Sequence, residues 1–227
     1  EAASQGVGKK GLAALAGASY ANATINADRN QKSFKLSFDA FMKKRGASTI
    51  ISKGKQMKRA NAALFENIER RYGVPAGPLI AIWGMETGFG GYMGKQNTIS
   101  AITTLAYDCR RPDYFKPHAI AALKLVDKGT LSSSSVGAMH GEVGHTQFLP
   151  GNVLRYGVDG NGNGNVDLRD KADALASTAN FLRGHGWQPG AGYQPGEPNF
   201  AAIQEWNAAS VYQRAIAIIG AKIDGDR

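Results

Sequence analysis

Residues 79–90 read LIAIWGMETGFG, a stretch that predicts a helix with a carboxyl group on its apolar side. Steps of three, four and seven residues from Leu79 reach an isoleucine, a tryptophan and Glu86. No helical neighbour of Glu86 is cationic, so we expect desolvation to raise its pKa and keep it protonated near neutral pH. The glycines at positions 88, 90 and 91 leave the backbone open beside it, as a ligand cleft requires. The stretch predicts a general acid; the alternative is a carboxylate that turns to water or pairs with a distant arginine.

Outward from this stretch, the patterning is mostly helical. Apolar spacing and glycine or proline boundaries predict helices at 10–16, 57–72, 79–86, 117–128, 171–183 and 210–222. Strand signals are weak, with one extended piece expected at 132–136. Residues 184–200 are rich in glycine and proline and are typical of a long loop. The predicted fold class is therefore mainly α, with a minor β contribution.

Composition narrows the class of protein. The 227 residues are 43% hydrophobic, and no run approaches the roughly 18–20 apolar residues that a membrane span needs. Lys and Arg outnumber Asp and Glu by 27 to 18, a net charge of +9 that favours polyanions such as nucleic acid, anionic lipid or an acidic cell wall. No basic run is interleaved with aromatic residues, so nucleic acid is not a predicted partner. The single cysteine, Cys109, excludes an internal disulfide and a cysteine-based zinc site.

Residues 159–170 read DGNGNGNVDLRD, which fits the twelve-residue EF-hand loop. A glycine stands at position six, where the turn needs it, and oxygen donors stand at the ligand positions. The predicted ligands are Asp159, Asn161, Asn163, Asn165 (through its carbonyl), Asp167 and Asp170. Because only three of them are carboxylates and the last is Asp rather than Glu, we expect weak structural binding of Ca²⁺ or another hard cation. The alternative is a metal-free turn.

The run IWGMETGFG at 82–90 closely resembles the catalytic helix of the membrane-bound lytic murein transglycosylase B family. Shorter matches follow in the family's order: TLAY at 104–107, RRPDYF at 110–115, GAM at 137–139, TQFLP at 146–150, ANFL at 179–182, GW at 186–187, WN at 206–207 and then Tyr212. Each motif is weak alone, but the ordered set is specific and spans residue 30 to the C-terminus.

The resemblance implies a lysozyme-like helical core with a small accessory subdomain that contains the EF-hand-like loop. We therefore expect a loosely ordered lead-in at 1–25 and a single catalytic domain at 26–227, in which 137–187 form the inserted subdomain. It also implies a periplasmic bacterial protein, a monomer, attached to the outer membrane in its precursor through a segment that precedes Glu1.

The chemistry implied by the resemblance is non-hydrolytic cleavage of peptidoglycan between N-acetylmuramic acid and N-acetylglucosamine. Glu86 is the sole acid and base in that scheme, the substrate's N-acetyl group assists, and the product ends in a 1,6-anhydro ring. No cofactor is required for this chemistry, and the implied partner is the glycan strand. The alternatives are a true muramidase, which adds water, and a non-catalytic wall-binding scaffold.

Further site residues carry over from the resemblance, each with ordinary packing or surface charge as its alternative. Ser134 matches a serine that orients the N-acetyl group, with a register that neighbouring serines leave open by one residue. The residues expected to contact substrate in the cleft are Arg110, Arg111, Tyr114, Gln147, Phe181 and Asn207, with Phe181 standing where the family often has Tyr. The stretch HGEV at 140–143 departs from the family pattern as an insertion, expected to form a surface loop or a polar wall of the site.

Overall fold

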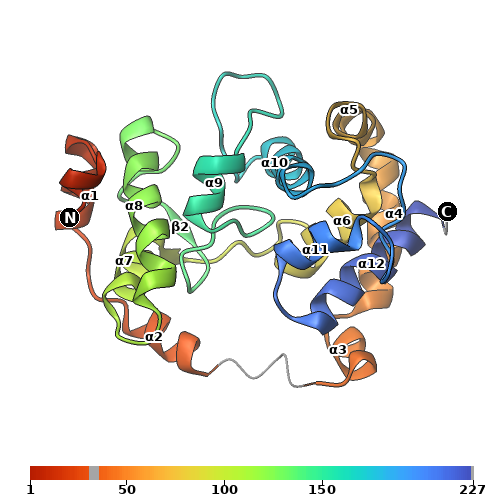
Figure 1. Ribbon diagram of the computed structural model, residues 1–227, viewed down its shortest axis with the longest axis horizontal. Coiled ribbons are helices and arrows are strands. Elements are labelled where there is room, and N and C mark those ends of the chain that lie inside the picture. The colour runs from red at the N-terminus through yellow and green to blue at the C-terminus, as the bar shows by residue number, and fades with distance from the viewer. Residues whose placement is uncertain (31–35, 226–227) are drawn as a thin grey trace. The chain divides into compact units, whose positions relative to one another are not determined.

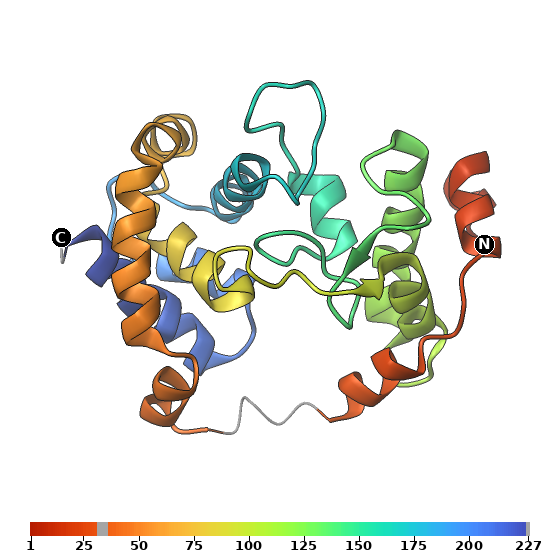
Figure 2. The same ribbon diagram turned by 180° about the vertical axis from the view of Figure 1, so that it is seen from behind.

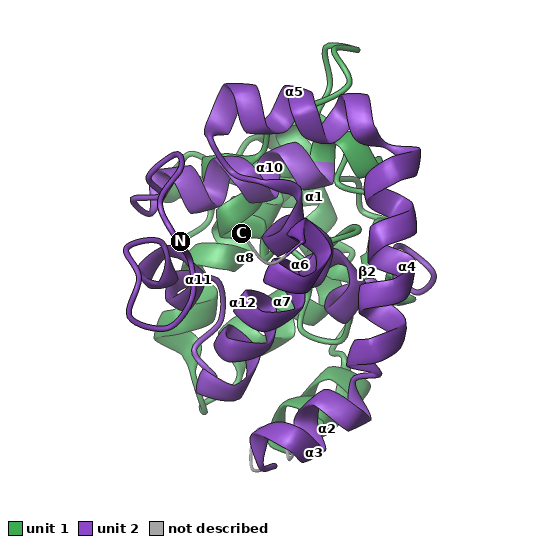
Figure 3. Ribbon diagram, turned by 90° about the vertical axis from the view of Figure 1, so that its right-hand side faces the viewer, with its two compact units in different colours: residues 1–31, 93–173 green, residues 32–92, 174–227 purple. Residues whose placement is uncertain are grey.

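The computed structural model describes residues 1–30 and 36–225 and is mostly helical, as predicted (Figure 1). The chain divides into two compact units (Figure 3). Unit 1 comprises Glu1–Gln31 and Met93–Asp173, and unit 2 comprises Lys32–Tyr92 and Ala174–Arg227. Each unit is therefore assembled from two separate stretches of chain, and its limits differ from the boundaries expected at residues 25, 137 and 187.

Unit 1 is built around a pair of packed helices, α7 and α8, with α1 and α9 against α8 and α2 against α7. Its helices are α1 (Lys9–Ala16), α2 (Asn22–Arg29), α7 (Thr98–Tyr107), α8 (Pro112–Lys128) and α9 (Pro150–Tyr156), preceded by a 3-10 turn, η1 (Ala3–Gln5). Two short antiparallel strands, β1 (Gln96–Asn97) and β2 (Val136–Gly137), pair Gln96 with Gly137 and Asn97 with Val136. The extended piece expected at 132–136 is thus a strand only at its end.

The N-terminal stretch, expected as a loosely ordered lead-in, contains α1 and the start of α2. Asp127 fixes the start of α1, because its carboxylate accepts hydrogen bonds from the backbone N–H groups of Gly8 at 2.6 Å and Gly11 at 2.8 Å. These bonds satisfy amide groups that the first turn of a helix leaves unpaired. Val7 and Ala14 then join the apolar core of unit 1.

Unit 2 is organised around α6, which packs against α4 and α12 (Figures 1 and 2). Its helices are α3 (Phe38–Lys44), α4 (Ala47–Ala60), α5 (Ala62–Tyr72), α6 (Ala76–Thr87), α11 (Phe200–Trp206) and α12 (Ser210–Asp224), and it also holds most of α10 (Lys171–Gly184). Glycine allows α6 and α12 to touch, since a Cβ on Gly77 would lie 2.3 Å from the carbonyl oxygen of Gly220. A helix that is apolar on all sides is stable only when it is enclosed in this way.

Two segments differ from their predicted form, and a third, the loop at 184–200, keeps it. The helix expected at 57–72 is two helices, α4 and α5, separated at Asn61, whose backbone leaves the helical region (φ −124°, ψ 33°). The helix expected to begin at Pro117 begins at Pro112, because proline suits the first turn equally well there. The loop at 184–200 is pinned by Asn199, whose side-chain N–H groups donate to the carbonyls of Gln188 at 2.8 Å and Ala191 at 2.9 Å. Within the described residues, no helix combines the length and apolarity needed to cross a membrane.

Candidate active site

Glu86 is the one residue of α6 that is not buried. The sequence pattern placed it on an apolar stripe, but α6 is enclosed on every side and Glu86 is its only opening to the surface. The helix ends directly after it, at Gly88, which adopts a left-handed conformation (φ 58°) and donates its N–H to the carbonyl of Gly84 at 3.1 Å. A Cβ on Gly88 would meet no atom within 4 Å. The backbone beside the carboxyl group is therefore open, as predicted.

The carboxyl group of Glu86 accepts a hydrogen bond from a residue far away in the sequence. The phenol of Tyr212, in α12, donates to Oε1 of Glu86 at 2.6 Å. Only 2% of Tyr212 is exposed. Burial, together with the neighbouring charge of Glu86 and this hydrogen bond, raises the pKa of Tyr212 well above its ordinary value. The phenol is thus a permanent neutral donor aimed at the carboxyl group, while the raised pKa expected of Glu86 itself stays a prediction.

Arg45 contacts both the ring of Tyr212 and the end of α6. Its guanidinium carbon lies 5.6 Å from the ring centre of Tyr212 and 5.3 Å from that of Phe41, distances typical of cation–π contacts. Its Nη1 donates to the carbonyl oxygen of Met85 at 3.4 Å, near the end of α6. Arg45 stands in a short basic run without any local pattern that marks it. Tyr212 belongs to the ordered family motifs, but its sequence position does not predict the contact with Glu86.

Two further predicted residues belong to unit 2. Asn207 lies between α11 and α12, where its Oδ1 accepts the N–H of Ala209 at 2.9 Å and its carbonyl accepts from Nε2 of Gln213 at 2.8 Å. Its side chain therefore shapes the turn that leads to Tyr212. Phe181 is 3% exposed, and its ring packs edge-on against Trp206 at 5.2 Å. So deep a position leaves little of this ring for stacking on a sugar.

In unit 1, the two predicted arginines share one buried carboxylate. Arg110 and Arg111 both form ion pairs with Asp28 of α2, which is 2% exposed, while the arginine side chains remain 43% and 38% exposed. Arg110 also donates to the carbonyl of Asp28 at 2.6 Å. Burial alone would raise the pKa of Asp28, but the hydrogen bonds and charges of both arginines outweigh it and lower this pKa below its ordinary value. Two cations against one anion leave this cluster with a positive, partly exposed face.

The insertion at 140–143 is packed into unit 1, which corrects the expectation of a surface loop. Val143 is buried, and a Cβ on Gly141 would lie 3.0 Å from the side chain of Ile102. His140 extends the arginine cluster, with Nε2 at 3.7 Å from Asp28 and Nδ1 at 3.4 Å from Glu142. The insertion thus supplies partly buried polar groups to the cluster around Asp28.

The remaining predicted residues of unit 1 differ in exposure. Tyr114 is exposed and lies edge-on to Phe115 at 4.9 Å. Ser134 is exposed, and its hydroxyl lies 3.0 Å from that of Ser132. Gln147 has a left-handed backbone (φ 58°) and donates from Nε2 to the carbonyl of Gly144 at 2.8 Å. Among the described residues, only Gln147 and Phe89 show positive φ without being glycine, and such strain is found most often at functional sites.

The loop at 159–170 is held by hydrogen bonds between its own side chains and its backbone. The carboxylate of Asp159 accepts N–H groups from Gly162 and Gly164, both at 2.6 Å, and the side-chain oxygens of Asn161 and Asn163 each accept the N–H two residues ahead. Backbone hydrogen bonds, that of Gly164 foremost, lower the pKa of Asp159, so it stays charged. No group of three acidic, histidine or cysteine side chains converges on one point within the described part of the chain. The side-chain oxygens of Asp159, Asn161 and Asn163 are thus engaged with backbone N–H groups of the loop, and cation binding stays a prediction.

Asp173, which the sequence analysis did not single out, closes this loop. Its buried carboxylate accepts the N–H groups of Gly160 at 2.8 Å and Asp167 at 2.8 Å, which lie near the two ends of the loop. Asp170, predicted as the last ligand, accepts the N–H of Ala172 at 2.8 Å at the start of α10. One carboxylate thus holds the loop shut from inside the protein, and another caps the helix that follows.

Comparison with known proteins gives consistent results. A family model described as the transglycosylase SLT domain matches residues 1–197. Membrane-bound lytic murein transglycosylase B of Escherichia coli (strain K12) is 35% identical over 137 residues, which cover 56% of this chain and 38% of that protein. The match thus spans less than half the length of that curated relative.

Solved structures share the fold. SltB3 from Pseudomonas aeruginosa, in complex with NAG-NAM-pentapeptide, is similar with a TM-score of 0.89 and 27% identity, covering 99% of this chain and 77% of that one. Slt35 of Escherichia coli, in complex with calcium, is similar in fold with a TM-score of 0.81 and 23% identity, covering 92% of this chain and 85% of that one. These likenesses confirm the predicted mainly α, lysozyme-like fold class.

The cluster around Asp28 predicts acid-sensitive stability. A carboxyl group whose pKa is lowered on folding stabilises the protein above its unfolded pKa of about 3.9, and this contribution is lost as the pH falls through the folded value. Asp28→Asn should lower the free energy of unfolding at pH 7 by roughly 1–3 kcal/mol, less than the ~3–5 kcal/mol of fully buried pairs because both arginines remain hydrated. Urea unfolding at pH 7 and pH 3 measures this difference.

The matched control is Asp113→Asn, which removes an exposed carboxylate from the first turn of α8. It should change stability by less than about 1 kcal/mol at either pH. A deficit of Asp28→Asn that is as large at pH 3 as at pH 7 would contradict the ionic origin of the effect.

Proposed function

Because the chain belongs to the transglycosylase SLT domain family, we propose that it is a lytic transglycosylase that cleaves peptidoglycan glycan strands between N-acetylmuramic acid and N-acetylglucosamine. The observation that carries this proposal is the position of Glu86. It is the only residue of α6 at the surface, it is followed by an open glycine, and its carboxyl group accepts a hydrogen bond from a neutral buried phenol. A general acid and base needs such a fixed and partly dry setting.

In the proposed mechanism, Glu86 takes part in two proton transfers. The protonated carboxyl group first gives its proton to the glycosidic oxygen, while the carbonyl oxygen of the substrate's N-acetyl group attacks the anomeric carbon and the glycosidic bond breaks. The carboxylate then takes the proton of the sugar's 6-hydroxyl, whose oxygen displaces the N-acetyl oxygen and closes the 1,6-anhydro ring. Tyr212 donates to Oε1 of this carboxyl group throughout. The phenol also steadies the carboxylate between the two steps.

The other predicted residues take supporting roles in this proposal. The left-handed backbone of Gln147 supports its assignment as a polar group of the site, because such residues cluster at active sites. Arg110 and Arg111 keep exposed donors while paired with Asp28, and they suit carboxylates of a wall polymer, with Tyr114 beside them as an exposed ring. Ser134 is proposed to orient the N-acetyl group of the substrate. Asn207 is proposed to line the site at the turn before α12, and Phe181 to support the site by packing against Trp206.

The place of action proposed is the periplasmic side of the bacterial wall, where the chain works as a monomer on glycan strands. The net charge of +9 supports this partner, because an acidic polymer attracts a basic protein over long range. We also propose that the loop at 159–170 holds Ca²⁺ as a structural ion through Asp159, Asn161, Asn163, Asn165, Asp167 and Asp170. Bound there, the ion would neutralise the loop's carboxylates, and it takes no part in the chemistry.

Glu86→Gln tests the catalytic assignment. Loss of the only general acid should reduce release of 1,6-anhydromuropeptides from purified murein sacculi by roughly 100-fold or more, since such groups contribute about 10²–10⁴-fold. Mass spectrometry of the soluble products measures this, with Glu66→Gln as the control that changes an exposed glutamate of α5. Products with reducing ends would instead indicate a muramidase, and a wild-type protein that binds sacculi without releasing product would indicate a scaffold.

Tyr212→Phe tests the hydrogen bond to Glu86. The ring and its contacts with Phe41 and Arg45 remain, while the donor to the carboxyl group is lost. That donor favours the charged form, so its removal should shift the alkaline limb of the pH–activity profile to higher pH and reduce the rate of the first, acid-catalysed step, which produces the carboxylate. Rates of product release from pH 4 to pH 9 provide the measurement. Tyr92→Phe, at an exposed tyrosine, should leave the profile unchanged, and an unaltered profile for both variants would rule out the positioning role.

Calcium binding to the loop predicts ligand-dependent stability. Added at about ten times a Kd of order 1 mM, Ca²⁺ should stabilise the wild-type protein by about 1.4 kcal/mol and raise its melting temperature by a few degrees. Asp159→Ala should abolish the shift, because it removes the first ligand and the acceptor of the Gly162 and Gly164 amides. Differential scanning calorimetry with Ca²⁺, with Mg²⁺ and with chelator distinguishes site binding from a general ionic effect. Equal responses of both proteins would count against a site in this loop.

A further inference from the structure

The first turn of α9 is held by a side chain of another helix. Leu149, at its N-cap, forms no side-chain hydrogen bond with the turn, and Pro150 has no N–H group. The two amides that follow Gly151 both donate to the carbonyl of Leu149, at 2.9 and 3.1 Å. Gly151 donates its own N–H to Nδ1 of His118, in α8, at 3.0 Å. His118 therefore takes the place of a helix cap that the residues before α9 do not supply.

The contact between His118 and α9 requires glycine. A Cβ on Gly151 would lie 2.5 Å from Nδ1 and 3.0 Å from Cε1 of His118, so a side chain at position 151 would displace the imidazole. The imidazole also contacts the ring of Tyr114, one turn earlier in α8, with the ring centres 5.3 Å apart. One ring thus touches both the start of α9 and the exposed tyrosine that is proposed to contact substrate.

The segment that carries Gln147 leads directly into α9. Val143 and Phe148 exchange backbone hydrogen bonds at 2.9 and 3.0 Å, which close the chain around Gln147 on one side. On the other side, only two residues separate Phe148 from Gly151. The position of Gln147 therefore depends on where the first turn of α9 is held.

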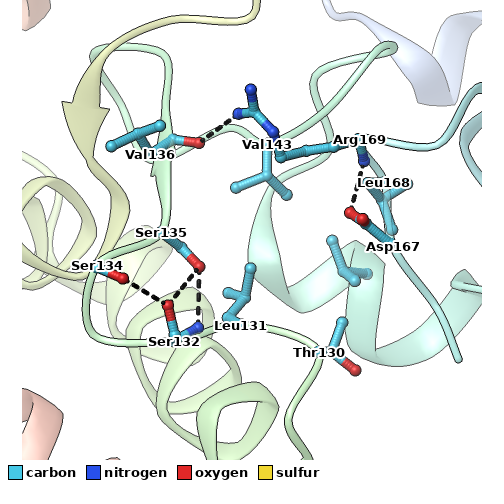
Figure 4. Close-up of a pocket in the computed structure, with 11 residues that line it drawn as sticks. Thr130, Leu131, Ser132, Ser134, Ser135, Val136, Val143, Asp167, Leu168 and Arg169 are labelled. Carbon is cyan, nitrogen blue, oxygen red and sulfur yellow. Dashed lines mark hydrogen bonds between the residues drawn. The ribbon is translucent and has the colours of Figure 1, made fainter.

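α9 has open space on the side of the turn at 130–136. Val153 of α9 lines a pocket of about 240 Å³, together with Leu131 and Val143, whose side chains are drawn in Figure 4. Empty space beside a helix removes packing contacts that would oppose its displacement. α9 packs against α8, and the contacts with α8, that of His118 among them, therefore anchor this turn.

The hydrogen bond from Gly151 needs a neutral imidazole. Nδ1 accepts only while it carries no proton, so the single ring proton lies on Nε2. Burial, and then the charge of Arg155 in α9, lower the pKa of His118 below its ordinary value of 6.5. Above pH 6.5 the bond is thus intact, and its contribution to stability is lost as the pH falls through the folded value.

The groups around His118 favour the neutral ring. The helices α1, α7 and α9, which pack against α8, carry no acidic residue; their ionisable residues are Lys9 and Lys10 of α1, Tyr107 of α7, and Arg155 and Tyr156 of α9. On α8 itself, the carboxylates are Asp113, exposed in the first turn, and Asp127, which accepts amides of Gly8 and Gly11. A proton on Nδ1 would face the N–H of Gly151 and add a positive charge near Arg155, so the bond would break.

We propose that His118 is a positioning residue for the reaction: its unprotonated Nδ1 holds the first turn of α9, and thereby Gln147, and acidification releases both. The consequence for cleavage rests on the proposed function, in which Gln147 and Tyr114 contact the glycan strand. His118 itself touches no reacting atom in this scheme. It makes the shape of one wall of the site depend on pH, separately from the titration of Glu86.

A pair of substitutions separates positioning from general stability. In His118→Asn, Oδ1 takes the place of Nδ1 and accepts the same N–H without titrating, whereas His118→Leu has no acceptor. At pH 8, release of product from sacculi should stay near the wild-type rate in His118→Asn and fall roughly fivefold or more in His118→Leu, the effect of one lost hydrogen bond. At pH 5, the wild-type rate should fall toward that of His118→Leu, while His118→Asn keeps its rate. Lys116→Gln, at an exposed residue of the same helix, is the control and should follow the wild type.

Nitrogen-15 NMR of the whole protein without substrate tests the geometry alone. At pH 8 the ring proton of His118 should lie on Nε2, and at any one pH the amide of Gly151 should exchange roughly fivefold or more faster in His118→Leu than in His118→Asn. Gly151→Ala should reproduce the effect of His118→Leu and replaces it if that variant fails to fold by circular dichroism.

The two measurements distinguish the possible failures. A proton on Nδ1 at pH 8, or cleavage that declines in acid as steeply in His118→Asn as in the wild type, overturns the positioning role alone. The expected ring proton and amide exchange in a protein that releases no product from sacculi overturn the proposed function alone.

Discussion

The hydrogen bond from Tyr212 to Glu86 is the contact on which the candidate active site depends. It joins two helices, α6 and α12, whose close packing requires glycine at positions 77 and 220. Because every other residue of α6 is buried, this helix has no freedom to rotate and present Glu86 differently. The carboxyl group therefore owes its position to the packing of unit 2 as a whole, and the phenol adds a donor whose own proton is held firmly by burial.

In unit 1, by contrast, ion pairs hold the predicted site residues in place. Asp28 is buried and accepts from two arginines, which ties α2 to the start of α8. A buried carboxylate is costly unless it is fully paired, so the arrangement favours one geometry of these segments over others. Each arginine still exposes part of its guanidinium. The two arginines, which the sequence predicts as substrate contacts, therefore also stabilise the fold. Both roles are compatible because a guanidinium has five N–H donors.

The sequence was sufficient for those features that depend on local order. The helix at 79–86, the open glycines after it and the final helix from Ser210 follow from spacing and end signals alone. The contact between Glu86 and Tyr212 could not be predicted, since it joins residues 126 positions apart and depends on how two helices pack. Asp28 and Asp173 were missed for the same reason: a single buried carboxylate has no local pattern. The turn at Asn61 was missed because the apolar spacing continues across it.

Unit 1 also connects the EF-hand-like loop to a predicted site residue through a short series of contacts. The carbonyl of Leu168, at the exit of the loop, accepts the backbone N–H of His145 at 2.9 Å. The carbonyl oxygen of Arg169 lies 3.0 Å from Nε2 of the His145 ring. Gly144, next to it, allows no side chain, because a Cβ there would lie 2.1 Å from the carbonyl oxygen of Leu168. Its own carbonyl accepts the side-chain amide of Gln147 at 2.8 Å. The strained backbone of Gln147 thus rests on a segment that the loop holds in place, and Asp173 holds the loop. A loop remote in sequence from Glu86 therefore packs against the segment that carries Gln147, whose backbone is also held by the paired hydrogen bonds between Val143 and Phe148 on either side of it.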